Sequence, residues 1–160
     1  MAATFENLRI LQESEAIADA LWKHVTRWDE FARDVVGKQL ARAADSVGAN
    51  IAESFGRFNF GEKLQFLYYS RGSLFETKYW LNRACTRNLM TSTETQSYAS
   101  QLTELARGLN TFASSLKAVR AEAKTHSHTI HESTMEYLAY DPDEFSDPLF
   151  TESDLAWLSS

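Results

Sequence analysis

Hydrophobic residues recur along most of the chain at intervals of three and four residues, which places them on one face of an α-helix. The pattern predicts four helices, at about residues 5–28, 33–55, 61–88 and from Thr91 onward. The fourth has the most regular hydrophobic positions, which are Tyr98, Leu102, Leu105, Leu109, Phe112, Leu116 and Val119. Its start is marked by Thr91 and Glu94, which have the spacing of a capping box. Sustained alternation of hydrophobic and polar residues is absent from the sequence, so the predicted fold class is all-α.

The connections between these helices are short, near residues 29–32, 57–60 and 89–92. Short connections make successive helices antiparallel neighbours. We therefore expect residues 1–125 to form an antiparallel, up-down-up-down four-helix bundle. The helical pattern breaks after about Lys124, and two Asp-Pro pairs follow at 141–142 and 147–148. Residues 126–160 are therefore predicted to be a C-terminal, acidic and largely disordered tail.

Composition restricts the class of protein. The 160 residues are 44% hydrophobic and 24% charged, which is typical of one globular domain. A single cysteine, Cys85, excludes a disulfide framework and a cysteine-rich zinc site. The sequence contains neither an apolar run long enough to span a membrane nor a recognisable secretory signal. We expect a cytoplasmic protein without membrane contact.

The net charge of −6 conceals a strong asymmetry along the chain. Residues 132–160 carry 8 of the 22 acidic residues and neither lysine nor arginine. The other 131 residues hold 14 acidic and all 16 basic residues, a net charge of +2. A mildly basic body is thus joined to a strongly acidic tail.

The tail also contains many large hydrophobic residues, which a merely solvating segment would lack. The candidates for docking are Phe145, Leu149, Phe150, Leu155, Trp157 and Leu158. Ser153 precedes the last three and is expected to cap a short helical turn, with Trp157 as its best anchor. Acidic and hydrophobic residues in alternation indicate a segment that folds on a protein partner. A packing arm on the chain's own bundle is the alternative, and both remain open.

Two stretches carry a family resemblance: RAADSVGANIAESFGR at 42–57 and EKLQFLYYSRGSLFETKYWLNRA at 62–84. They resemble a bacterial four-helix bundle family first noted in rRNA intervening sequences. That family also includes the accessory variability determinant of diversity-generating retroelements. The matching residues are Ser46, Val47, Asn50, Ile51, Ala52, Glu53, Gly56, Arg57, Phe66, Leu67, Gly72, Ser73 and Glu76. Ser54 stands where the family usually has glycine, and Leu11 where tryptophan is common.

The resemblance covers about residues 5–119 and leaves the acidic tail without a counterpart. It implies a four-helix protomer that assembles as a homopentamer and has no catalytic activity or cofactor. It also implies a role in binding RNA or DNA, or in binding a reverse transcriptase.

Four polar residues lie beside the hydrophobic stripes of the second and third helices: Asn50, Glu53, Ser73 and Glu76. Each pair is three residues apart and shares a helix face. Two carboxylates could indicate acid–base chemistry. A nucleophile, a poised base and a metal set are all lacking nearby, so we interpret the four as a buried polar network that fixes helix register.

Two basic groups are candidates for nucleic-acid binding. Arg57, Lys63 and Arg71 are interleaved with aromatic residues around the turn between the second and third helices. Lys117, Arg120 and Lys124 share one face of the fourth helix. The first group also suits a subunit interface, which we favour, and the second suits cations near a helix C-terminus.

The histidines His126, His128 and His131 do not have metal-ligand spacing, since they face different sides of a helix. Cys85 has the surroundings of a packing residue. The leading hypothesis is therefore a non-enzymatic oligomeric adaptor, by resemblance a pentamer, for a nucleic-acid-handling enzyme such as a reverse transcriptase, with the tail docking a protein partner. A stand-alone RNA- or DNA-binding ring is the first alternative. A defence-system component whose tail is read by an effector is the second.

Overall fold

The computed structural model describes residues 5–127 and 147–160, and the regular elements of these residues are all helical. They are α1 (Phe5–Val25), α2 (Glu30–Ala32), the π-helix η1 (Arg33–Gly37), α3 (Lys38–Gly56), α4 (Phe60–Thr86), α5 (Ser92–Ser127) and α6 (Glu152–Ser159). The prediction of an all-α chain is confirmed for these residues. Among them, no helix combines the length and the apolar character needed to cross a membrane.

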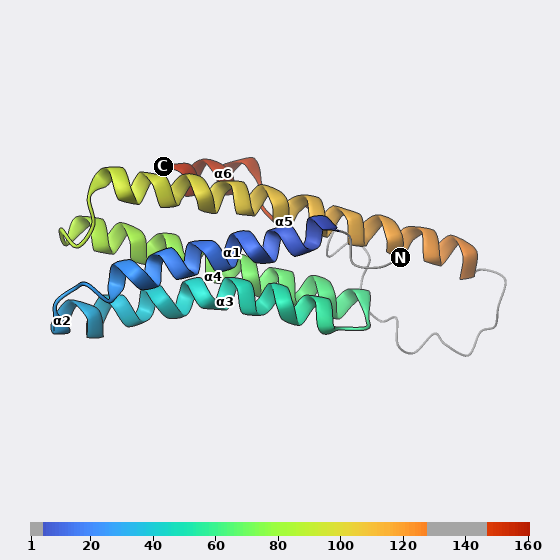
Figure 1. Ribbon diagram of the computed structural model, residues 1–160. Helices are drawn as coiled ribbons and strands as arrows, with labels where there is room; N and C mark the ends of the chain where they lie inside the picture. Colours follow the sequence, from blue (N-terminus) through green and yellow to red (C-terminus); the bar gives the residue numbers. More distant parts are fainter. Residues whose placement is uncertain (1–4, 128–146) are drawn as a thin grey trace.

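The long helices α1, α3, α4 and α5 lie side by side as a helical bundle (Figure 1). α3 packs between α1 and α4, and α5 packs against α4 and α1. Short connections join successive long helices at alternating ends of the bundle (Figure 1). The short helix α6 lies alongside α5, on the outer side of the bundle.

The core consists mainly of leucine and isoleucine side chains at the heptad-like positions of the predicted stripes. Leu67, Leu74 and Leu81 of α4 are fully buried, as are Leu40 and Ile51 on the preceding helix. Burying each such side chain stabilises the fold by about 1.5–3 kcal/mol relative to leaving it in water. The hydrophobic periodicity therefore identified most of the inner faces of the helices. Val119, the last position of the stripe predicted for the fourth helix, is an exception, because it is 49% exposed.

Two fully buried serines connect α3 to α4. The Ser54 hydroxyl donates a hydrogen bond to the carbonyl oxygen of Lys63, at 2.8 Å. The Ser70 hydroxyl donates to the carbonyl oxygen of Val47, at 3.0 Å. A misaligned register would leave these buried hydroxyls without partners, which is costly. The two bonds therefore fix how α3 and α4 are aligned.

The second long helix begins earlier than the predicted residue 33. Asp29 is the N-cap of α2, where its side chain accepts a hydrogen bond from the backbone N–H of Ala32 at 2.9 Å. The helix then widens into the π-turn η1 before it continues as α3. Within η1, the Gly37 backbone lies so close to α1 that a Cβ atom there would be 2.5 Å from Cγ1 of Val25.

The start of α5 agrees with the predicted capping box. The Thr91 N–H donates to the Glu94 carboxylate at 2.8 Å, and the Glu94 N–H donates to the Thr91 hydroxyl at 3.2 Å. Asn88, in the preceding turn, has a φ of 58°, in the left-handed region that asparagine tolerates better than most residues. The sharp connection between α4 and α5 is thus encoded locally.

The prediction of a largely disordered tail is wrong for residues 147–160. These residues include α6, and Leu149, Phe150, Leu155 and Leu158 belong to the hydrophobic core. They pack on the bundle because it offers enough apolar surface to offset the loss of chain entropy. The N-cap of α6 is Thr151 rather than Ser153. Phe145 lies outside the described residues.

The close approach of η1 to α1 generates a prediction. Gly37→Ala should lower the free energy of unfolding by about 1–3 kcal/mol, because its Cβ would collide with Val25. The matched control is Gly72→Ala in α4, where no heavy atom lies within 4 Å of the new Cβ. That variant should be neutral or more stable by up to about 1 kcal/mol, because alanine favours helices. Urea denaturation measures both, and equal effects would contradict this packing.

Candidate protein-interaction site on α4 and α5

Residues 147–160 are here called the C-terminal segment. Two helices, α4 and α5, supply the side chains that bind it. α4 supplies Arg71 and Phe75, and α5 supplies Gln96, Asn110 and Lys117. We call these five residues the α4–α5 docking surface. They are spread along the outer faces of the two helices, so they contact the segment along its whole length.

Asn110 binds the backbone of the C-terminal segment at a single residue, Phe150. Its side-chain amide nitrogen donates to the Phe150 carbonyl oxygen at 2.8 Å, and its amide oxygen accepts from the Phe150 N–H at 2.7 Å. One side chain thus satisfies both polar groups of a backbone unit that is otherwise buried. This pair of bonds fixes the path of the chain just before α6 begins.

Aromatic stacking adds a second set of contacts. The Phe75 ring stacks on Phe150, with ring centroids 6.0 Å apart and planes 7° apart. It also stacks on Trp157, at 5.2 Å and 12°. The guanidinium of Arg71 lies 4.7 Å from the centre of the Phe75 ring, within the range of a cation–π contact. A residue of α4 therefore contacts two aromatic residues of the C-terminal segment.

Arg71 also forms an ion pair with α6. Its Nη2 atom is 3.2 Å from the Oδ2 atom of Asp154. The same carboxylate accepts a hydrogen bond from the Thr151 N–H at 2.8 Å and completes the capping box of α6. Burial raises the pKa of Asp154, but the hydrogen bonds from Thr151 and Arg71 outweigh it and hold this pKa below the usual 3.8. The cap and the ion pair thus favour the ionised form.

The two ends of the C-terminal segment are held by polar contacts to backbone oxygens. The Lys117 ammonium donates to the carbonyl oxygen of Asp147 at 2.8 Å. Partial burial lowers the pKa of Lys117, although Asp147 acts in the opposite direction. The Gln96 side chain donates to the carbonyl oxygen of Ser159 at 2.9 Å. Polar contacts thus extend from the first residue of the segment almost to its last.

The basic groups predicted to bind nucleic acid are mostly engaged within the chain. Arg57 forms an ion pair with Glu53, and Lys63 donates to the carbonyl oxygens of Ser54 and Phe55 at the end of α3. Arg71 and Lys117 bind the C-terminal segment, as described above. Arg120 is half-buried on α5, and the Lys124 side chain lies outside the described atoms.

The predicted buried polar network is wrong for its two carboxylates. Asn50 donates to the backbone oxygen of Ser46 at 2.8 Å and lies 3.4 Å from the Ser73 hydroxyl, so these two residues do connect α3 and α4. Glu53 and Glu76 are exposed. A step of three residues turns the helix face by about 60°, which is enough to carry both carboxylates out of the interface.

One buried cation, Lys78 of α4, was not predicted from the sequence. Lys78 is only 1% exposed, and burial lowers the pKa of its ammonium group below the ordinary 10.5. A signal was present, because Lys78 lies four residues after Leu74 and so extends the hydrophobic stripe of α4. Cys85, also on α4, is a half-buried free thiol.

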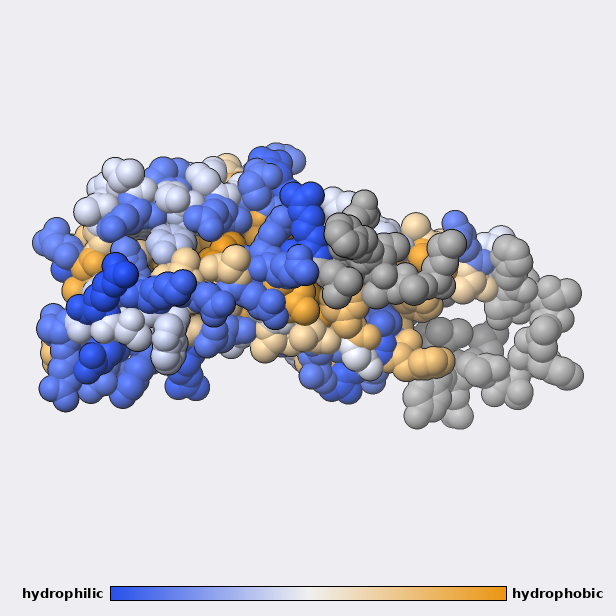
Figure 2. Space-filling model, viewed as in Figure 1, coloured by the Kyte–Doolittle hydropathy of each residue, from blue (hydrophilic) through white to orange (hydrophobic). Residues whose placement is uncertain are grey.

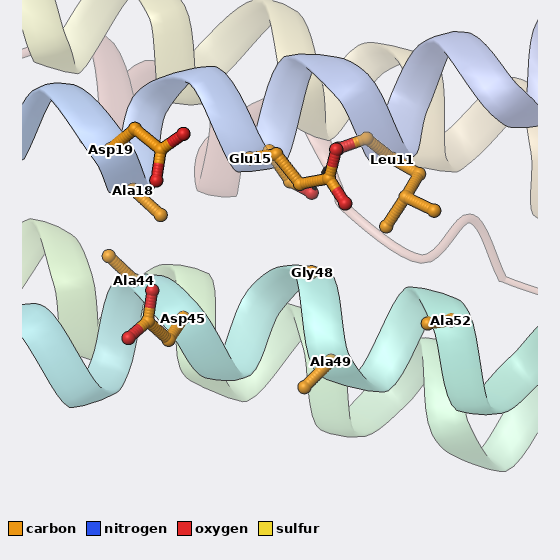
Figure 3. Close-up of a pocket in the computed structure, with 10 residues that line it drawn as sticks. Leu11, Glu15, Ala18, Asp19, Ala44, Asp45, Gly48, Ala49 and Ala52 are labelled. Carbon is orange, nitrogen blue, oxygen red and sulfur yellow. Dashed lines mark hydrogen bonds between the residues drawn. The ribbon is translucent and has the colours of Figure 1, made fainter.

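A second concave surface lies between α1 and α3 (Figure 3). This pocket has a volume of about 430 Å³ and is lined mainly by small and acidic residues. Ala18 and Ala44 point toward each other across it, and the carboxylates of Glu15, Asp19 and Asp45 lie around it. No group of residues suited to hold a metal ion occurs among the described residues. His128 and His131 lie outside them, as does the side chain of His126.

The chain was compared with known families and curated proteins. The family model described as "23S rRNA-intervening sequence protein" matches residues 6–111. No curated protein matches the chain. The matched region contains Arg71, Phe75, Gln96 and Asn110, and it ends before Lys117 and the C-terminal segment. Four of the five docking residues therefore lie within the matched region, whereas the segment that they bind lies outside it.

The packing of the C-terminal segment generates a prediction. Phe150→Ala should lower the free energy of unfolding by up to about 4 kcal/mol, because it removes a buried ring. The loss cannot exceed the free energy of docking, since the segment can detach. The matched control is Ser153→Ala, an exposed position of α6 that should change stability by less than about 0.5 kcal/mol. Equal denaturation curves for both variants would contradict the docking.

A second prediction concerns pH. Since the pKa of Asp154 is lower in the docked state, its carboxylate stabilises docking above about pH 4, and this contribution disappears as pH falls through the lowered value. Trp157 fluorescence should report release of the segment on acidification, in a background with the other three tryptophans replaced by phenylalanine. Asp154→Asn in that background should weaken docking at pH 7 and flatten the profile. An unchanged profile would exclude this role for Asp154.

Proposed function

Because the chain belongs to the family of 23S rRNA-intervening sequence proteins, we propose that it is a non-enzymatic, homo-oligomeric adaptor. Its protomer is an antiparallel, up-down-up-down four-helix bundle, and its assembly is a pentamer. In this proposal the assembly serves a nucleic-acid-handling enzyme such as a reverse transcriptase. The pentamer and the enzyme partner rest on the sequence resemblance of residues 42–57 and 62–84 to the family pattern.

Several large hydrophobic residues lie on the protomer surface, and their exposure supports the proposed oligomer. Phe58 is 100% exposed and Phe31 is 77% exposed. Trp22, Tyr69 and Tyr79 are also at least half exposed. Aromatic residues are enriched in protein interfaces, because burying their large apolar surface stabilises the complex. Hydrophobic residues also interrupt the hydrophilic surface on the face seen in Figure 2.

The contacts of the basic residues favour an adaptor over a stand-alone RNA- or DNA-binding ring. Arg57, Lys63, Arg71 and Lys117 each bind an acceptor within the chain. A phosphate backbone would have to compete with these acceptors. Tight nucleic-acid binding usually requires several free cations on one face, because its free energy comes largely from counterion release.

In this proposal, docking of the C-terminal segment on its own protomer regulates access of a protein partner to the segment. Four of the predicted docking residues, Leu149, Phe150, Leu155 and Leu158, are buried on the protomer itself. A partner that binds these side chains must therefore displace the segment from the α4–α5 docking surface. Trp157 is 39% exposed while it stacks on Phe75, so a partner could contact it first.

The oligomer is tested by replacing exposed aromatic residues. Phe31→Ser and Phe58→Ser should leave the stability of the protomer within about 0.5 kcal/mol of the parent, because these surface rings are not part of the core. At least one of them should lower the mass measured by light scattering coupled to gel filtration. The control is Glu62→Ser, an exposed polar position of α4. A parent chain that elutes at 18.2 kDa would contradict the proposal.

A further inference from the structure

We propose that the C-terminal segment is exchanged between copies of the chain, so that residues 147–160 of one protomer occupy the α4–α5 docking surface of its neighbour. The inference rests on the homo-oligomer of the proposed function and adds a specific link between its subunits. The occupant is thus a second copy of the segment seen on the bundle, and its contacts with the five docking residues are those already described.

The C-terminal segment has the properties of a separable ligand. Its helix α6 carries its own capping box, in which Thr151 and Asp154 satisfy each other's backbone N–H groups. Its interactions with the docking surface combine a backbone clamp by Asn110, an ion pair with Arg71 and stacking on Phe75. These contacts depend on the segment and the surface alone. A segment delivered by another copy would therefore make the same contacts.

The connection to the body is much longer than docking within one chain requires. The first contact of the segment is between Asp147 and Lys117, and Lys117 lies ten residues before the end of α5 at Ser127. Ten residues of helix span about 15 Å, which about five extended residues can cover. The sequence supplies 19 residues, 128–146, between the two ends. Connections of this length are uncommon in compact domains, where they are usually functional loops or linker segments.

The same length allows the segment to reach a neighbouring subunit. Nineteen residues span at most about 65 Å, which exceeds the roughly 54 Å length of α5, the longest helix described. Within an oligomer, each C-terminal segment can therefore reach two kinds of docking surface, the one on its own subunit and the one on a neighbour. The two compete for the segment at similar effective concentrations. Exchange around a closed assembly adds one such link per subunit and leaves each docking surface filled. We infer that the long connection serves this exchange.

Cross-linking of full-length chains tests the inference. All chains carry Cys85→Ser, which removes the only native thiol. One chain then carries Gln96→Cys and another Ser159→Cys, at two exposed positions that the docked segment brings together. The two chains are co-expressed and treated with a short bis-maleimide. A product of twice the chain mass forms if the segment docks on a neighbour, and each variant alone controls for random cross-links.

A chain with both cysteines measures the balance between the two arrangements. Exchange predicts that at least half of its cross-linked product contains two or more chains. Adding Phe150→Ala should reduce all cross-linked products at least fivefold, because the segment then detaches. Cross-links confined to single chains, in samples that light scattering shows to be oligomeric, would overturn the exchange and leave the proposed function standing. Samples that are monomeric would overturn the proposed oligomer, and the exchange with it.

Discussion

The packing of α3 against α4 is the contact on which the rest of the molecule depends. The buried hydroxyls of Ser54 and Ser70 bond to backbone oxygens of the facing helix, so the two helices fit together in only one register. The outer helices then follow from this pair, because α1 packs on α3 and α5 packs on α4. Ser54 thus contributes both to the close packing of α3 and α4 and to the hydrogen bonds between them.

The same register positions the docking surface. Arg71 follows Ser70 directly, and Phe75 lies one helical turn further along α4. Ser70 is held against α3, and Arg71 and Phe75 lie about 100° and 140° from it around the axis of α4. Both side chains contact the C-terminal segment. The backbone clamp by Asn110 comes from the neighbouring helix at the same level. Core packing and the interaction site are therefore parts of one arrangement.

Sequence patterns predicted the features that depend on residues close together in the chain. The hydrophobic periodicity located the long helices, the Thr91–Glu94 spacing located the start of α5, and the family resemblance is confirmed by the match over residues 6–111. The role of Arg71 could not be predicted, because its partner Asp154 is 83 residues away in the sequence. The close approach of α1 to Gly37 in the π-turn η1 is likewise a contact between separate helices, which local patterns do not reveal. The acidic charge of the last residues indicated disorder, but their hydrophobic side chains determine the fold of residues 147–160.

In the full-length chain, the C-terminal segment is docked on the α4–α5 docking surface. Hydrogen exchange followed by mass spectrometry measures this directly on peptides covering residues 147–160 of the full-length chain. Docking predicts slow exchange of the Phe150 amide, which Asn110 holds, and of the amides in α6. Asn110→Ala should accelerate exchange in these peptides while leaving the amides of α3 and α4 protected. Exchange of residues 147–160 as fast as that of the same peptide free in solution would contradict docking.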